Sequence, residues 1–151
     1  MSTSKAFNPS NDQPLIYPTW KLNEALEESF KSFSQEIMAF AKDFLQKHSP
    51  HYGPGSKGLW EMRKTHSNAF YLVAPQTLLI QLDNGFEELL NPQAMGLLIT
   101  IKFYQAKYNI ENDENVKDSE EDLYHRENFR KLVSLFLSNA IRPEYHSAIA
   151  A

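Results

Sequence analysis

Apolar residues in the N-terminal third of the chain return every three or four positions. This spacing places them on one face of an α-helix. The helix is expected to begin at about Thr19 or Asn23 and to end at His48, because Ser49-Pro50 disfavours helical geometry. Its apolar face contains Leu22, Leu26, Phe30, Phe33, Ile37, Phe40 and Phe44.

In the middle of the chain, apolar and polar residues alternate instead, which is typical of β-strands. Strands are expected over residues 59–64, 70–74 and 77–82, with a short fourth strand over 86–89 as an option. In the first strand, alternation places Trp60 and Met62 on the core face, as it does Phe70 and Leu72 in the second. The connections are short, and residues 83–85 (Asp-Asn-Gly) form the strongest turn signal. The pattern predicts a small antiparallel β-meander of three to four strands.

Two further helices follow the strands. Asn91 is expected to cap the first of them, and Pro92 suits its first position. Gly96 is a poor helix former and predicts close approach of another element. Ser119 and Asp122 have the spacing of a capping box before the second helix, which ends at about Asn139.

These elements predict an α+β fold, with the meander packed against three main helices in a single domain. The chain has 151 residues, enough to bury a core without disulfides or metals. Residues 19–151 form the expected domain, and the polar residues 1–18 form a flexible N-terminal arm whose last residues, 15–18, are apolar enough to dock on it.

The composition narrows the function classes. The chain contains no cysteine, which excludes disulfides, thiolate catalysis and cysteine-based metal sites. It shows no membrane-spanning run and no signal peptide, so we expect a cytoplasmic protein without a membrane partner. The net charge of −4 argues mildly against a surface built to hold phosphates and is too small to imitate DNA.

Catalytic and metal-binding patterns are weak. His48 and His51 have a chelating spacing, but Pro50 breaks the helix between them. Glu61 could orient His66 or His125 as the general base of a hydrolase, although His125 is better explained as a hydrogen-bonded core histidine. We therefore expect no enzymatic activity, no cofactor and no metal.

A nucleic-acid-binding accessory protein is the alternative. Lys57, Arg63, Lys64 and His66 cluster around the first hairpin, with Trp60 and Tyr71 near them in the pattern. Aromatic side chains between cations can stack bases while the cations neutralise phosphates. The cluster is small, however, and Trp60 alternates toward the core, so direct DNA binding is the weaker interpretation.

Several blocks, taken in order, resemble the ArdB/KlcA family of antirestriction proteins. They are Tyr52-Gly53, Trp60-Glu61, the run Ser67-Asn68-Ala69-Phe70-Tyr71-Leu72-Val73-Ala74-Pro75, Asn84-Gly85-Phe86, Ala94-Met95-Gly96-Leu97 and Tyr124-His125. The similarity covers about residues 40–150, and one glycine of the family's Asn-Gly-Gly turn is replaced by the Asn68-Ala69 pair.

The resemblance implies a small, non-enzymatic protein of a plasmid, phage or integrated mobile element, acting in the cytoplasm of a bacterial host. Such proteins relieve restriction of incoming DNA by type I restriction–modification enzymes. The implied partner is the type I restriction–modification complex or a host factor acting on it. The family's mixed α/β fold, with a small antiparallel sheet, agrees with the pattern described above.

The candidate interaction surface has two parts. The hairpin contributes Glu61, Arg63, His66, Asn68 and Tyr71. The acidic stretch that precedes and enters the last predicted helix contributes Glu111, Asp113, Glu114, Asp118, Glu120 and Glu121. Turn formation and solvation are the simpler explanation of both sets.

Overall fold

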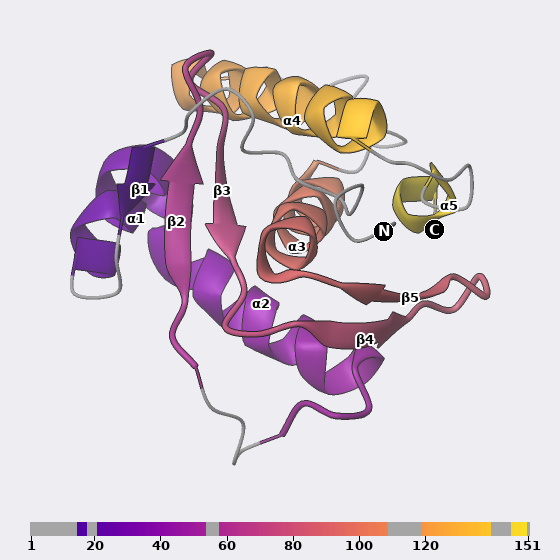
Figure 1. The fold of residues 1–151 in the computed structure, drawn as a ribbon. Helices are drawn as coiled ribbons and strands as arrows, with labels where there is room; N and C mark the ends of the chain where they lie inside the picture. The colour runs from indigo at the N-terminus through magenta and orange to yellow at the C-terminus, as the bar shows by residue number, and fades with distance from the viewer. Residues whose placement is uncertain (1–14, 18–20, 54–57, 109–118, 140–145, 151) are drawn as a thin grey trace.

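The computed structural model describes residues 15–17, 21–53, 58–108, 119–139 and 146–150 (Figure 1). The chain is a mixture of helices and strands, so the prediction of an α+β fold is confirmed. In order along the chain, the elements are β1 (Leu15–Tyr17), α1 (Leu22–Phe30), the 3₁₀ turn η3 (Lys31–Phe33), α2 (Ser34–His48), β2 (Glu61–Lys64), β3 (Phe70–Val73), β4 (Leu78–Gln81), β5 (Glu87–Leu90), α3 (Pro92–Lys107), α4 (Glu120–Asn139) and α5 (His146–Ala150).

Helix α3 is the centre of the fold, and every residue from Ala94 to Tyr104 in it is buried. It contacts β3, β5, α2, α4 and α5, and Figure 1 shows these elements arranged around it. A helix that is buried on all sides belongs to the core rather than to a surface layer. Among the described residues, no helix combines the length and apolar character that crossing a lipid bilayer requires.

The long N-terminal helix predicted from the apolar stripe is divided in two. Lys31 has a φ of 53°, which an α-helix does not tolerate, and η3 separates α1 from α2. Phe33, within η3, packs against Phe103 with ring centroids 5.5 Å apart. The prediction was wrong here because the three-or-four spacing of apolar residues continues across a single tight turn.

The predicted single meander is also wrong in detail, because the strands form two antiparallel sheets. The first sheet has the order β1-β2-β3, and the second contains β4 and β5. Strand β1 comes from residues 15–17 of the predicted flexible arm, and it pairs with β2 from Leu15 opposite Lys64 to Tyr17 opposite Met62. The apolar end of the arm therefore docks, as expected, but it does so as a strand of the sheet.

The outer edge of β3 explains why β4 does not join the first sheet. The side chain of Asn128 binds both backbone groups of Phe70: its Oδ1 accepts from the Phe70 amide at 3.0 Å, and its Nδ2 donates to the Phe70 carbonyl at 3.1 Å. Two residues later, the Leu72 amide donates to Thr100 Oγ1 at 3.1 Å. Side chains of α3 and α4 thus occupy the hydrogen-bonding edge that a neighbouring strand would need.

Close packing of β3 on α3 depends on Gly96, as the sequence predicted. A Cβ atom at this position would lie 1.8 Å from the Leu72 carbonyl oxygen. Next to this contact, the Ala74 amide donates to the Pro92 carbonyl at 2.9 Å, which fixes the end of the strand to the start of the helix. Only glycine allows the two backbones to approach this closely.

Both predicted helix caps are confirmed. Asn91 Oδ1 accepts a hydrogen bond from the Ala94 amide at 2.8 Å at the start of α3. At the start of α4, Ser119 Oγ accepts from the Asp122 amide and Asp122 Oδ2 accepts from the Ser119 amide, each at 3.1 Å. This reciprocal pair is the capping box.

Candidate functional site

The β2–β3 hairpin carries most of the residues that the sequence singled out. Trp60, Met62, Phe70 and Leu72 are all buried, with at most 8% of any of them exposed. Their predicted role as core residues is confirmed. The apolar side of the hairpin is therefore scaffold: β3 packs against α3 and α4, and β2 packs against α1.

The predicted surface of the hairpin is only partly a surface. His66 and Asn68 are exposed at the tip, and Glu61 and Arg63 are half-buried on β2. Tyr71 is fully buried, so its assignment to the surface was wrong. Strict alternation predicts one exposed face for a strand, but all four residues of β3 are buried because both faces of this strand are covered.

The hairpin tip is held by local hydrogen bonds. The Thr65 amide donates to the Ala69 carbonyl at 2.7 Å, and Thr65 Oγ1 accepts from the Ala69 amide at 3.1 Å. Asn68 adopts a φ of 69°, a left-handed conformation that asparagine tolerates better than most residues. Asn68 therefore supplies the left-handed residue of this turn.

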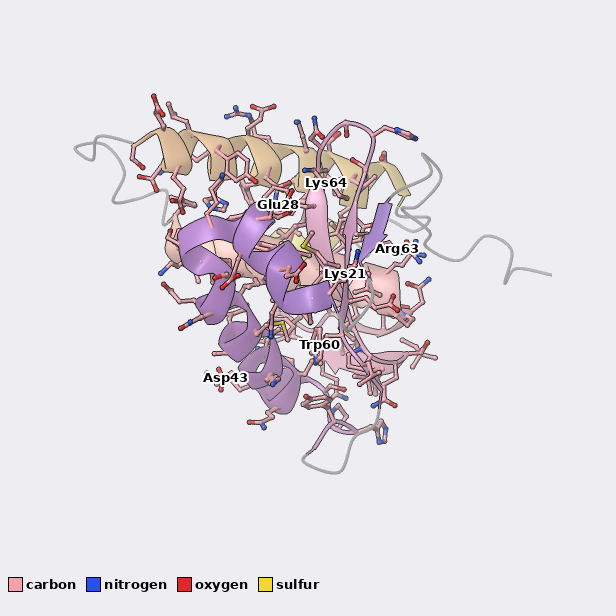
Figure 2. All side chains as sticks on the ribbon, turned by 90° about the vertical axis from the view of Figure 1, so that its left-hand side faces the viewer. Lys21, Glu28, Asp43, Trp60, Arg63 and Lys64 are labelled. Atoms are coloured by element: carbon pink, nitrogen blue, oxygen red, sulfur yellow. The ribbon has the colours of Figure 1, made fainter. Side chains whose placement is uncertain are left out.

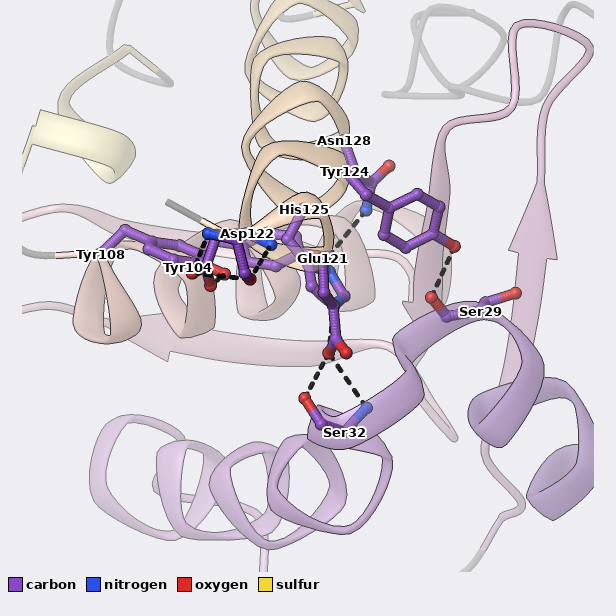
Figure 3. A network of polar contacts seen from close by, with 10 residues as sticks. Ser29, Ser32, Tyr104, Tyr108, Glu121, Asp122, Tyr124, His125 and Asn128 are labelled. Atoms are coloured by element: carbon purple, nitrogen blue, oxygen red, sulfur yellow. Dashed lines mark hydrogen bonds and ion pairs between the residues drawn. The ribbon is translucent and has the colours of Figure 1, made fainter. Parts of the chain in front are cut away.

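The acidic part of the predicted surface divides into three groups. Glu111, Asp113, Glu114 and Asp118 lie outside the described residues. Glu120 is exposed in the first turn of α4. Glu121 instead points back into the fold: its Oε2 accepts hydrogen bonds from the backbone amide of Ser32, at 3.1 Å, and from the Ser32 hydroxyl (Figure 3). Glu121 ties α4 to η3, which is a structural role.

A polar network continues inward from Glu121 (Figure 3). His125 is fully buried, and its Nε2 lies 3.4 Å from Glu121 Oε2. Its Nδ1 lies 2.7 Å from the Tyr104 hydroxyl, which in turn accepts a hydrogen bond from Asn128 Nδ2 at 3.1 Å. The prediction of a hydrogen-bonded core histidine is confirmed.

The donors and acceptors of this network fit one arrangement. Asn128 Nδ2 can only donate, so the Tyr104 oxygen accepts from it and the Tyr104 proton is directed to His125 Nδ1. The ring proton of neutral His125 is then on Nε2, which faces Glu121. A continuous chain of polar contacts thus connects the edge of β3, through Asn128, with η3.

Burial decides the protonation states in the network. It lowers the pKa of His125, and this effect outweighs the attraction of Glu121, which acts in the opposite direction. It also raises the pKa of Tyr104. The hydrogen bond from the Ser32 hydroxyl lowers the pKa of Glu121. At neutral pH the network therefore holds a neutral imidazole beside an ionised carboxylate.

Two further tyrosine contacts fix α4. The Tyr124 hydroxyl donates to the Ser29 carbonyl at 2.7 Å, and the Tyr108 hydroxyl donates to Asp122 Oδ1 at 2.8 Å (Figure 3). The first contact joins α4 to α1 and the second joins it to the end of α3. The start of α4 is therefore anchored to three other parts of the fold.

The structure does not assemble the hydrolase alternative. Glu61 begins β2, whereas His66 lies beyond its other end, roughly 10 Å or more away along an extended strand. His125 is bonded to Tyr104 and faces Glu121, not Glu61. Neither histidine therefore has Glu61 as an orienting carboxylate.

His48, one of the two histidines considered for metal binding, has other contacts. His48 Nδ1 lies 3.2 Å from the Gln81 carbonyl, and its ring packs on Phe44. Across the described part of the chain, no cluster of three or more histidine, aspartate or glutamate residues is placed to hold a metal ion.

The nucleic-acid alternative loses its proposed stacking platform. Trp60 and Tyr71 are both buried and have no face available for a base. Lys57 lies outside the described residues. Of the other predicted cations, Arg63 is half-buried on β2, His66 is exposed at the hairpin tip, and Lys64 lines a hollow together with residues of α4.

Comparison with known proteins adds no family assignment: no protein-family model matches the chain, and no curated protein matches it. The resemblance to the ArdB/KlcA family therefore depends on the residue blocks themselves.

Asn128 is the important residue that sequence reasoning missed. It is 2% exposed and binds both Phe70 and Tyr104. A signal was present, because Asn128 stands three positions after His125 and one before Phe129 on the apolar side of α4. A polar residue within such a stripe indicates a buried hydrogen-bonding role.

Proposed function

We propose that this protein relieves type I restriction of incoming DNA through a non-enzymatic, interaction-based mechanism. The observation that carries the proposal is the ordered set of residue blocks shared with the ArdB/KlcA family, from Tyr52-Gly53 to Tyr124-His125. Under this proposal, the protein acts in the cytoplasm of a bacterial host that carries a mobile element.

The places of these blocks in the fold support a common scaffold. Gly96 is the position where α3 touches the backbone of Leu72. Asn84 caps the β4–β5 turn by accepting from the Phe86 amide at 3.1 Å. His125 is the centre of the buried network. Each of these residues has a structural role that a shared fold would require. Chance is therefore a poorer explanation of the matching blocks.

An interaction-based mechanism is supported by how the buried polar groups are used. Two groups that could perform acid–base chemistry, His125 and Tyr104, are bonded to each other deep in the core. General acid–base catalysis requires a group that can reach substrate. The exposed groups, such as His66 and Asn68 at the hairpin tip, suit contact with another macromolecule better.

The experiment is a plating assay with unmodified phage on a host with an active type I restriction system. Expression of the protein should raise the efficiency of plating relative to an empty vector. Phage already modified by the same host provides the control, since its plating is independent of restriction. Unchanged plating of unmodified phage, with the protein demonstrably expressed and folded, would sink the proposal.

A pull-down from the same host separates the two possible partners. Recovery of restriction–modification subunits with the tagged protein indicates direct inhibition. Recovery of another host protein, together with relief of restriction, indicates action through a host factor. A variant that carries alanine at Glu61, Arg63, His66 and Asn68 then tests whether the hairpin surface makes the contact.

A further inference from the structure

The tip of the β2–β3 hairpin meets α4 along a cleft with two hollows, and Lys131 lines both of them. The first hollow has a volume of about 350 Å³, and the second about 450 Å³. Lys131 Nζ donates to the Ser67 carbonyl at 2.7 Å, which anchors it between the two. We define this hairpin–α4 cleft by the residues that line these hollows.

Polar side chains make up most of the lining of the first hollow. Its lining, as described by the structure, includes no carboxylate. Arg130 reaches Glu127 through Nη2, which leaves its other guanidinium donors available. Lys131 uses one of its three N–H donors on Ser67. The polar residues of this lining are Thr65, Ser67, Arg130, Lys131, Ser134 and Ser138.

The second hollow adds another cation. Lys64, half-buried at the end of β2, lines it opposite Lys131, and within the described residues its side chain forms no hydrogen bond or ion pair. Asn68 and Asn128 also line it. Glu127 is its one carboxylate among the described residues, and the hydrogen bond from Arg130 lowers the pKa of that carboxyl.

We propose that the hairpin–α4 cleft binds phosphate esters, through Arg130, Lys131 and Lys64. A phosphate offers several acceptor oxygens in a tetrahedral arrangement and so suits cations combined with hydroxyl donors. A planar carboxylate offers only two acceptor oxygens, so it would use fewer of the donors that meet in this cleft. Because the stacking residues are buried, recognition is through phosphate and not through bases.

Two sources could supply this chemistry: a single phosphate ester such as a mononucleotide, or the backbone of a nucleic-acid strand. The presence of two adjoining hollows that share one lysine fits a ligand with more than one phosphate. The inference does not depend on relief of restriction, and it can fail or succeed separately from that proposal.

The test measures binding of three probes to the full-length protein at low salt: inorganic phosphate, adenosine monophosphate and a fluorescently labelled single-stranded oligonucleotide. Lys64→Met and Arg130→Ala should each weaken binding by about tenfold, the loss expected for one charge-assisted hydrogen bond. Lys131→Met should weaken it similarly, and Lys131→Arg should preserve it. Thermal melting verifies that each variant is folded.

Lys42→Met is the matched control, because Lys42 is exposed on α2. Its neighbour Asp43 lies toward the opposite end of the molecule from Lys64 (Figure 2). This variant removes a surface lysine without changing the cleft, so its affinity should equal that of the wild type.

The probes also distinguish the source of the phosphate. Tighter binding of the oligonucleotide, with a logarithmic salt slope of roughly −0.7 per phosphate contacted, assigns the cleft to a strand. Equal binding of all three probes assigns it to a single phosphate. The proposal is overturned if none of the three probes binds, or if the cleft variants bind with unchanged affinity. Equal competition by polyglutamate would also overturn it.

Discussion

Polar residues on the two sides of α4 have different roles. On the inner side, His125 and Asn128 are buried and bonded to Tyr104. On the outer side, Arg130 and Lys131 line an open cleft, and each has N–H donors beyond the one that it uses on Glu127 or Ser67. One helix therefore carries both a closed network that builds the fold and an open set of donors that can bind a partner.

This contrast distinguishes the residues that carry the family resemblance from the residues that could bind a partner. Most residues of the blocks that resemble the ArdB/KlcA family are buried, among them Gly96 against β3 and His125 within the network. Arg130 and Lys131 belong to none of the matching blocks. A family signature made of scaffold residues supports a shared fold, whereas the working surface has to be found by experiment.

The largest expected effect tests the buried scaffold at Gly96, where α3 meets β3. In Gly96→Ala the new Cβ would meet the Leu72 carbonyl oxygen at 1.8 Å, so β3 and α3 must separate. We expect the free energy of unfolding to fall by about 4 kcal/mol or more. Chemical denaturation measures it. Gly53→Ala is the control, because nothing lies within 4 Å of a Cβ at that position, and a loss of similar size there would contradict the account.

Asn128→Ala tests whether the β3 edge depends on a side chain of α4. The change leaves the amide and the carbonyl of Phe70 buried without this partner. We expect a loss of about 2–4 kcal/mol in the free energy of unfolding. Faster hydrogen exchange of the Phe70 amide should accompany it. Asn23→Ala, at an exposed position of α1, should change neither quantity.

The pH dependence of stability tests the neutral state of His125. Burial lowers its pKa in the folded protein, whereas the unfolded chain binds a proton near pH 6.5. Below about pH 6.5 the unfolded chain therefore holds more protons, and the free energy of unfolding should fall by up to about 1.4 kcal/mol per pH unit until the folded pKa is reached. The pKa of Glu121 is also lowered in the folded protein, so protonation of this carboxylate reduces the free energy of unfolding only at a more acidic pH.

His125→Gln isolates this contribution. Denaturation between about pH 7 and pH 5.5 should show a smaller loss of stability on acidification in His125→Gln than in the wild type. His66→Gln removes an exposed histidine at the hairpin tip and serves as the control. An identical pH profile for His125→Gln and the wild type would contradict a buried neutral imidazole.

The smallest effect is expected at the capping box of α4. Ser119→Ala removes the acceptor of the Asp122 amide and should cost about 1 kcal/mol. Ser134→Ala, at an exposed position within the same helix, should have a smaller effect on stability. Thermal melting compares the two variants. An equal shift in both would show that the capping contact does not stabilise the start of α4.

Local chemistry accounts for what the sequence predicted correctly. The caps at Asn91 and Ser119 depend on residues three positions apart. A glycine within an apolar helix, as at Gly96, predicts close packing of another element without indicating which element it is. The alternation that placed Trp60 and Met62 in the core is likewise a property of one strand.

What the sequence did not reveal depends on distant segments. The pairing of β1 with β2 joins residues on either side of two helices. The capping of β3 by Asn128 spans 58 positions along the chain. Tyr71 is buried because both faces of its strand are covered, which alternation within that strand cannot indicate. These features arise from tertiary packing.

The most direct measurement for the central claim is the plating efficiency of unmodified phage on a type I-restricting host that expresses this protein. If the scaffold it resembles carries the same activity, plating should rise toward that of modified phage. Plating equal to the empty-vector control, with folded protein present, would contradict the claim that this fold relieves restriction.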